Sequence, residues 1–170
     1  MIYTDKQIKE KLLDLLKGSE NEVVEFKEAK DSFSFRDLGK YFSALGNEAN
    51  IRDKQEGWLV FGVKDNKEIK GTGFRANGGL QNLKKEIRNY TNEGMTFLEI
   101  YEFHIEGKRI IAFQIPPAIR GIPVTWNGAA YAREDENTCP LPLDKMDLIR
   151  SQIGYDWSKE ILPDATLDDL

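Results

Sequence analysis

The sequence predicts an α+β fold: a single domain with a mixed, mostly antiparallel sheet, two β-hairpins and three to four flanking helices. Segments with apolar residues at helical spacing alternate with short apolar runs of strand length. Two glycine-containing turns each join a pair of strand-like segments that are close in the chain. With 170 residues, 40% of them hydrophobic, the chain can build one core.

The first third of the chain predicts two helices and two strands. Thr4 can cap a helix that ends at Gly18, and Ser34 can cap a second helix. Between them, residues 22–27 alternate between polar and apolar side chains, which indicates a short strand. Residues 57–63 form a continuous apolar run led by glycine, so we expect a central strand covered on both faces.

The remaining elements are a third helix, two hairpins and a last helix. Gly78-Gly79 marks the entrance to the third helix, and Asn127-Gly128 is the strongest hairpin signal because both residues tolerate positive φ. In order, we expect a helix through Leu80, Leu83, Ile87 and Tyr90, strands at 97–105 and 109–115 joined by the three residues 106–108, strands at 123–126 and 129–132, and a helix at 143–153.

The domain organisation expected is one domain over residues 1–153 and an exit segment or linker over residues 154–170. The acidic composition of the last residues is typical of a linker to a C-terminal region beyond Leu170. No internal repeat or low-complexity tract divides the rest of the chain.

Composition narrows the class of function. The net charge of -5 argues against a protein that coats DNA or RNA over its whole surface, so nucleic-acid contact requires a local basic patch. No apolar run approaches the roughly 18 residues that cross a bilayer, and the N-terminus has no signal-peptide pattern, so we expect a cytoplasmic protein without a membrane partner. The single Cys139 offers neither an internal disulfide nor a zinc site.

A dense group of acidic residues precedes and enters the first strand, and Asp65 follows the central strand. Glu20, Glu25 and Asp65 can supply three oxygen ligands to Mg or Mn, which would support hydrolysis at a phosphate. In the competing interpretation, Glu22 and Glu28 are solvated, Glu25 pairs with a lysine or arginine on a neighbouring strand, and Asp65 is a turn residue. Spacing alone favours this second interpretation.

Candidate residues for nucleic-acid contact are basic. Lys84 and Arg88 are four residues apart and lie off the apolar stripe of the third helix, so they can face phosphates together or form a solvated surface. Arg133 can bind nucleic acid or pair with Glu25. Trp58 and Trp126 fit the core better than base stacking. The full set of candidate cations is Lys27, Lys30, Arg36, Lys40, Lys84, Lys85, Arg88 and Arg133.

Five segments in order resemble the Schlafen AlbA-like family over residues 18–142. They are residues 18–28, residues 41–48, the strand 57–65 ending in Gly-Val-Lys-Asp, residues 69–72, and the group of Pro123-Val124, Gly128-Ala129-Ala130-Tyr131-Ala132-Arg133 and Asn137-Thr138. The resemblance implies a nucleic-acid-handling module. In animal Schlafen nucleases three acids of this domain support metal-dependent RNA cleavage, and Glu20, Glu25 and Asp65 occupy the matching positions.

Three hypotheses of function follow. The first is a DNA-binding or RNA-binding module of a bacterial-type transcriptional regulator, because the family that the chain resembles usually lies at the N-terminus of such proteins, ahead of an ATPase-like region. The second is a metal-dependent nuclease acting on RNA or DNA through the three carboxylates. The third is an oligomerisation or partner-sensing domain, such as a homodimer. No Gly-Lys-Ser/Thr phosphate loop is present, so ATP is not expected as a cofactor of this chain.

Overall fold

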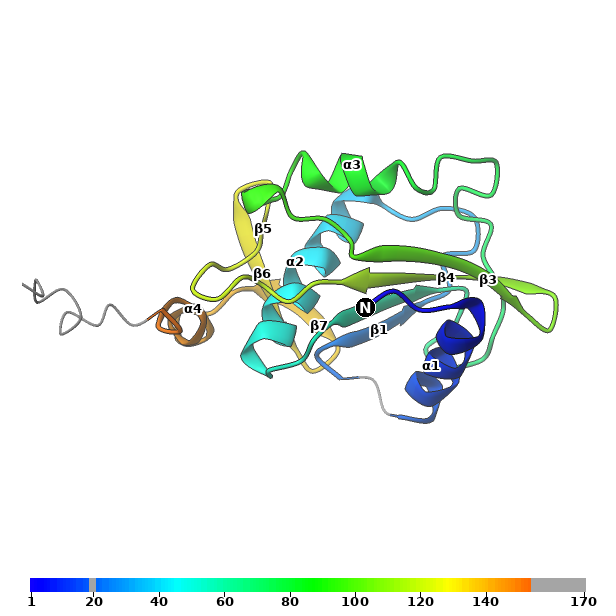
Figure 1. The fold of residues 1–170 in the computed structure, drawn as a ribbon, viewed down its shortest axis with the longest axis horizontal. Helices are drawn as coiled ribbons and strands as arrows, with labels where there is room; N and C mark the ends of the chain where they lie inside the picture. The colour runs from blue at the N-terminus through cyan, green and yellow to red at the C-terminus, as the bar shows by residue number, and fades with distance from the viewer. Residues whose placement is uncertain (19–20, 154–170) are drawn as a thin grey trace, which may run out of the picture.

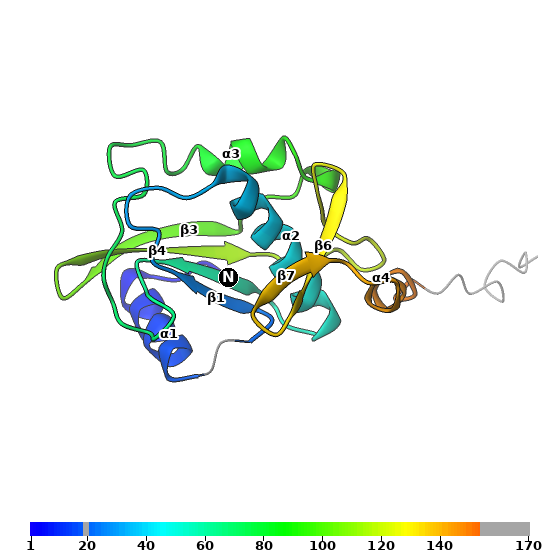
Figure 2. The ribbon, with the colours of Figure 1, turned by 180° about the vertical axis from the view of Figure 1, so that it is seen from behind.

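The computed structural model describes residues 1–18 and 21–153 and has an α+β architecture. Helices cover both faces of a four-stranded sheet, and a three-stranded sheet lies toward one end of the molecule (Figures 1 and 2). The fold class predicted from the sequence is therefore confirmed, with the strands divided between two sheets. The elements are α1 (Asp5–Lys17), β1 (Val24–Lys27), α2 (Phe35–Ile51), β2 (Gly57–Phe61), α3 (Leu83–Arg88), the 3-10 helix η1 (Asn92–Gly94), β3 (Glu99–Ile105), β4 (Lys108–Ile115), β5 (Thr125–Trp126), β6 (Ala129–Glu134), β7 (Asn137–Pro140) and α4 (Leu143–Arg150).

The main sheet has the strand order β1-β2-β4-β3. β1 runs parallel to β2, with Glu25 opposite Leu59, and the other two pairings are antiparallel. Every residue of β2 is buried, which confirms the central strand predicted from its apolar run. Because β1 and β2 are parallel, their carboxyl ends lie at the same edge of the sheet.

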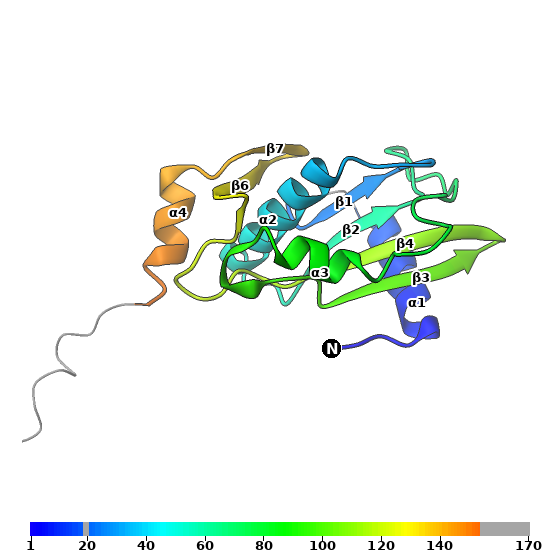
Figure 3. The same ribbon diagram turned by 90° about the horizontal axis from the view of Figure 1, so that it is seen from above.

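α1 covers one face of this sheet (Figure 3). Its start is fixed by a capping box, in which the Thr4 hydroxyl accepts a hydrogen bond from the backbone N–H of Gln7 and the Gln7 side chain accepts one from Thr4 N–H. Ile8 and Leu12 of α1 then pack into a core that includes Phe26 of β1. The helix predicted from Thr4 to Gly18 is confirmed.

The opposite face is covered by α2 and α3 (Figures 1 and 3). Ser34 caps α2 by accepting a hydrogen bond from Asp37 N–H, as expected. α2 also packs against the small sheet, and a Cβ added to Gly39 would lie 1.9 Å from Cε2 of Trp126. Glycine at this position therefore allows the helix and β5 to approach closely.

The small sheet has the order β5-β6-β7, with Asn127 at φ 48° and Gly128 at φ 83° in the predicted tight turn. Asn47 of α2 holds it in place. The Asn47 side chain accepts a hydrogen bond from Val124 N–H at 2.7 Å and donates one to the Tyr131 carbonyl at 2.8 Å. These bonds set the position of β6 relative to α2.

Several boundaries differ from the sequence predictions. The turn between β3 and β4 has two residues, Glu106 and Gly107, because both adopt positive φ and close a tighter hairpin than the expected three-residue connection. The helical segment of α3 is shorter than expected: Gly78 and Gly79 have positive φ, residues 80–82 form turns, and the helix runs only from Leu83 to Arg88. β7 was not predicted. Trp58 and Trp126 are buried, as expected for core residues.

None of the helices in residues 1–18 and 21–153 is long and apolar enough to span a membrane.

Candidate functional site

A buried ion pair joins the two sheets. Glu25 of β1 is 3% exposed, and its carboxylate contacts Nη2 of Arg133, a fully buried residue of β6. The other carboxylate oxygen lies 3.1 Å from Nζ of Lys27. This arrangement agrees with the interpretation in which Glu25 pairs with basic residues, and it places Arg133 in the interior.

The guanidinium of Arg133 is only partly satisfied by its neighbours. Its Cζ lies 5.7 Å from the centroid of the Tyr41 ring on α2. Among the described residues, its Nε and Nη1 have no hydrogen-bond partner. Buried polar atoms without a partner are costly and uncommon in folded proteins, and they often mark the place where a ligand or water binds.

A cleft of about 680 Å³ lies beside this pair. It lies between the end of β1, the start of α2 and the β6–β7 hairpin. Lys27 Nζ lies 5.5 Å from the centroid of the Tyr41 ring, and Lys40 Nζ lies 5.4 Å from that of Tyr131. Cation–π contacts of this kind keep each ammonium over an aromatic face. The cleft is lined by Lys27, Phe33, Asp37, Lys40, Tyr41, Tyr131, Thr138, Cys139 and Pro140.

The titratable groups of the cleft have distinct environments. Burial lowers the pKa of Lys27, but the Glu25 carboxylate and the Tyr41 hydroxyl raise it, and the resulting pKa lies above its ordinary value. Lys27 is therefore a cation at neutral pH. Burial, assisted by Glu134, raises the pKa of the Cys139 thiol, so this thiol stays protonated and is a weak nucleophile.

The other predicted cations divide into two groups. Lys30 and Arg36 are exposed on the segment between the two cleft lysines, and Arg36 lies one helical turn before Lys40. On α3, Lys84 Nζ is paired with Glu99 Oε1 at 2.6 Å, whereas Lys85 and Arg88 are exposed. Within the described part of the chain, α3 contributes no residue to the cleft.

The predicted acidic residues are not gathered in one pocket of the described chain. Asp65 lines an open pocket of about 500 Å³ with Glu28, at the shared edge of β1 and β2, whereas Glu25 is not among its lining residues. Glu20 lies outside the described residues. Over residues 1–18 and 21–153, no three His, Cys, Asp or Glu side chains are arranged to hold a metal ion. The three-carboxylate site therefore remains a prediction. Glu22 pairs with Arg52 at 3.1 Å, although a solvated side chain was expected.

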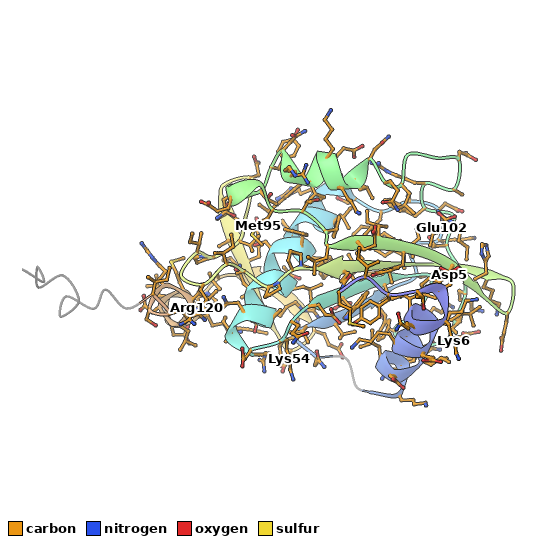
Figure 4. The ribbon with its side chains drawn as sticks, in the orientation of Figure 1. Asp5, Lys6, Lys54, Met95, Glu102 and Arg120 are labelled. Carbon is orange, nitrogen blue, oxygen red and sulfur yellow. The ribbon has the colours of Figure 1, made fainter. Side chains whose placement is uncertain are left out.

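A second buried acid, Glu48 of α2, supports the back of the cleft. Its Oε1 accepts a hydrogen bond from Arg133 N–H at 3.1 Å and contacts Lys145 of α4, and its Oε2 lies 3.3 Å from Nε of Arg52. Glu48 thus links α2 to both β6 and α4. Lys54 and Arg120, both labelled in Figure 4, line a smaller pocket of about 370 Å³ together with Gln152, which follows α4.

Tyr41, Tyr131 and Thr138 line the cleft but were not predicted as binding residues, although all three lie in segments that carry the family resemblance. Tyr131 and Arg133 are two residues apart on β6 and therefore lie on the same face, which the Gly-x-x-Tyr-x-Arg spacing contains as a signal. Tyr41 gives no such signal, because its position beside Lys27 depends on how α2 packs against β1.

Comparison with known proteins supports a family assignment. No curated protein matches the chain. A crystal structure of the DIP2311 protein from Corynebacterium diphtheriae has a similar fold, with a TM-score of 0.55 and 16% identity over 89% of this chain, which spans only 29% of that protein's chain. The solution structure of the N-terminal domain of a RecG-related protein from Nitrosomonas europaea matches 75% of this chain and 86% of that domain at 18% identity and a TM-score of 0.47. The model of the family described as "Schlafen, AlbA_2" matches residues 20–142, which is most of the chain, and the chain therefore belongs to that family.

Proposed function

We propose that this domain binds nucleic acid and serves as the DNA-binding module of a transcriptional regulator. Membership of the Schlafen, AlbA_2 family associates the chain with nucleic acids. The observation that carries the proposal is the group of cations around the cleft. Lys27 and Lys40 line it, and Lys30 and Arg36 are exposed on the segment between them.

Local concentration of these cations matters because the chain as a whole is acidic, with a net charge of -5. Phosphate contacts supply most of the affinity of non-specific nucleic-acid binding, and they require lysine or arginine side chains that are free to release counterions. Lys84 is engaged by Glu99, and both Arg133 and Lys27 contact Glu25, so these three add less to a phosphate surface than Lys30, Arg36 and Lys40. The β1–α2 segment is therefore the best-supported contact surface.

Fluorescence anisotropy with labelled duplex DNA, single-stranded DNA and tRNA tests this function. We expect binding that weakens as salt rises, because each phosphate contact releases counterions. The variant Lys30→Ala/Arg36→Ala should weaken binding. The plot of log binding constant against log salt concentration should also become less steep, by about 0.9 for each duplex phosphate that the variant no longer neutralises.

A matched control is Lys6→Ala/Lys9→Ala on α1, since both lysines are exposed and α1 lies on the other face of the sheet. The control removes the same charge and should bind like the wild-type domain. Equal weakening by both double variants would show that overall charge, and not the cleft, governs binding. Affinity that is absent at low salt would refute the function itself.

A metal-dependent nuclease is a second candidate, favoured by the shared pocket of Glu28 and Asp65 at the carboxyl ends of β1 and β2. Cleavage of tRNA in the presence of manganese, abolished in Glu25→Gln and in Asp65→Asn, would support it. Cleavage that persists unchanged in both variants would point to a contaminating nuclease.

Self-association is a separate hypothesis, favoured by apolar side chains at the α4 end. Leu143 and Leu148 of α4 are 76% and 55% exposed. We propose that these leucines contribute to a homodimer, which light scattering after size-exclusion chromatography would detect as twice the mass of the chain. A monomer at every concentration tested would exclude it, and Leu143→Glu/Leu148→Glu should return a dimer to the monomer.

A further inference from the structure

The cleft beside Arg133 combines two kinds of side chain that a simple phosphate-binding surface does not need together. Lys27 and Lys40 supply positive charge, whereas Phe33, Tyr41 and Tyr131 form aromatic walls. A duplex presents its phosphates on the outside and keeps its bases stacked inside. Its base faces are therefore not available to stack on aromatic side chains. An unpaired nucleotide offers a phosphate and a free base face at once.

Polar side-chain atoms without hydrogen-bond partners lie in and behind the same cleft. Thr138 lines the cleft, and its Oγ1, which is buried in the cleft wall, has no partner among the described residues. Behind it, the fully buried Arg133 leaves Nε and Nη1 unpartnered in the described part of the chain. Asp37 adds an exposed carboxylate at the rim, which can accept a hydrogen bond from an N–H group of a base, such as the ring N3–H of thymine. These groups suit a ligand with several polar atoms.

The size of the cleft agrees with such a ligand. Its volume of about 680 Å³ falls within the range of roughly 300 to 1,000 Å³ typical of small-molecule sites. A double helix, with a diameter near that of a small domain, cannot enter a space of this size, whereas one nucleotide of a flexible strand can.

We infer that the cleft binds a single unpaired nucleotide of a single-stranded nucleic acid, with its phosphate between Lys27 and Lys40 and its base against the tyrosine walls. This inference rests on the proposed nucleic-acid function and specifies the form of nucleic acid that the domain prefers. Thr138 Oγ1 and the rim carboxylate of Asp37 then provide hydrogen bonds to the nucleotide.

Anisotropy with two matched probes tests the preference: a labelled short oligothymidylate and a blunt-ended duplex with the same number of phosphates. We expect the oligothymidylate to bind roughly tenfold more tightly, the size of one base–aromatic stacking interaction. Tyr131→Leu and Thr138→Val should each weaken binding of oligothymidylate more than binding of the duplex and so remove much of this preference. Tyr90→Leu is the control, because Tyr90 is 49% exposed and lies outside the cleft lining.

The outcomes separate this inference from the proposed function. Duplex binding at least as tight as single-strand binding, or variants that weaken both probes equally or change neither, would overturn the nucleotide site and leave nucleic-acid binding intact. Absence of binding to either probe would overturn both. Thr138→Val also keeps the side-chain volume and removes only an unpartnered hydroxyl, so we expect it to fold normally.

Cys139 provides a second test on the unaltered protein. It is the single cysteine of the chain, and it lines the cleft. The rate at which Ellman's reagent modifies it should fall several-fold when oligothymidylate is bound and should not change with the duplex at the same fractional saturation. A rate that oligothymidylate leaves unchanged would place the bound nucleotide elsewhere.

Discussion

Arg133 brings a positive charge into the interior, where the Glu25 carboxylate and the Tyr41 ring lie against it. Removing two such charges from water costs several kcal/mol per ion, and their attraction offsets this cost only when the geometry is good. The ion pair between Glu25 and Arg133 therefore stabilises the fold less than the short distance between the two groups indicates. It does fix the position of β6 relative to β1. The cleft walls depend on that position.

Replacing one partner of this pair should destabilise the domain much more than replacing both. Arg133→Met leaves the buried Glu25 with Lys27 alone, and we expect it to lower the free energy of unfolding by about 3 kcal/mol. Glu25→Leu/Arg133→Met should recover most of this loss because no uncompensated charge remains. Urea denaturation followed by circular dichroism measures both.

Lys70→Met is a suitable control for this experiment, since its ion pair with Glu68 is exposed and should leave the unfolding midpoint unchanged. A double variant as unstable as Arg133→Met would show that the ion pair itself stabilises the fold.

At the scale of elements, α2 connects the two sheets. One side of it packs on β2, and Gly39 lets it approach Trp126 of β5. Farther along the helix, Asn47 bonds to the backbone of Val124 and Tyr131. The cleft lies along the first turns of the same helix, so a change in its packing against β5 would also move Lys40 and Tyr41.

Gly39→Ala tests this close approach. In an exposed helix, alanine in place of glycine would stabilise by up to about 1 kcal/mol. Here the added methyl group would overlap the Trp126 ring, and overpacking of a core costs about 1–3 kcal/mol or more, so we expect net destabilisation. Thermal unfolding would show a lower midpoint. For comparison, Gly18→Ala meets no atom closer than 3.6 Å and should change the midpoint little; a stabilised Gly39→Ala would contradict the packing described.

The segment that leads into α1 predicts a pH dependence. Tyr3 donates a hydrogen bond to Glu56 Oε1 at 2.6 Å, and burial together with this bond raises the pKa of Tyr3 to about 12. In the unfolded chain the pKa is about 10, so the folded state keeps this proton more tightly. The stability contributed by Tyr3 is therefore complete below pH about 10 and is lost as pH rises toward about 12.

Tyr3→Phe isolates this effect. At neutral pH the variant should be less stable than the wild-type protein by about 1 kcal/mol, because one hydrogen bond is missing. The difference in free energy of unfolding should shrink between pH about 10 and about 12, as the wild-type protein loses its advantage. A difference that stays constant over this range would refute the raised pKa.

At the scale of the whole molecule, two hydrophobic cores share the main sheet. Trp58 belongs to the core beneath α1, and Trp126 belongs to the core around α2 and α3. Because β2 and β4 contribute side chains to both cores, neither core can lose its packing without exposing the sheet. We therefore expect the described domain to unfold cooperatively.

Fluorescence of Trp58 and Trp126 can test this cooperativity once Trp157, the third tryptophan of the sequence, is replaced. In Trp126→Phe/Trp157→Phe, fluorescence reports on the core of Trp58, and in Trp58→Phe/Trp157→Phe it reports on the core of Trp126. Within each variant, the urea midpoint from fluorescence should coincide with that from circular dichroism. Separate midpoints in either variant would mean that its core unfolds independently.

The sequence predicted the features that depend on neighbouring residues. Ser34 as a helix cap, the buried run of β2 and the Asn127-Gly128 turn all follow from local preferences, and all are present. β7 was missed because Asn137–Pro140 has no apolar alternation and ends in proline, which is tolerated on an edge strand.

The site was less accessible to sequence reasoning. The pairing of Glu25 with Arg133 was one of the alternatives foreseen, because Glu25 was expected in a strand, Arg133 at the end of the Asn127-Gly128 hairpin, and the two carry opposite charges. The contact of Lys27 with Tyr41, and of Lys40 with Tyr131, joins elements that local patterns treat separately. Only tertiary packing brings these side chains to one cleft.

The parallel pairing of β1 with β2 has a consequence for the order of folding. β3 and β4 are joined by a two-residue turn, so they can pair within microseconds. β1 and β2 are separated in the chain by the whole of α2, so their pairing must close a much longer loop. We expect the β3–β4 hairpin to nucleate the sheet, β2 to dock on it and β1 to join last. Substitutions in the hairpin should then slow refolding, while those in β1 should mainly accelerate unfolding in stopped-flow measurements.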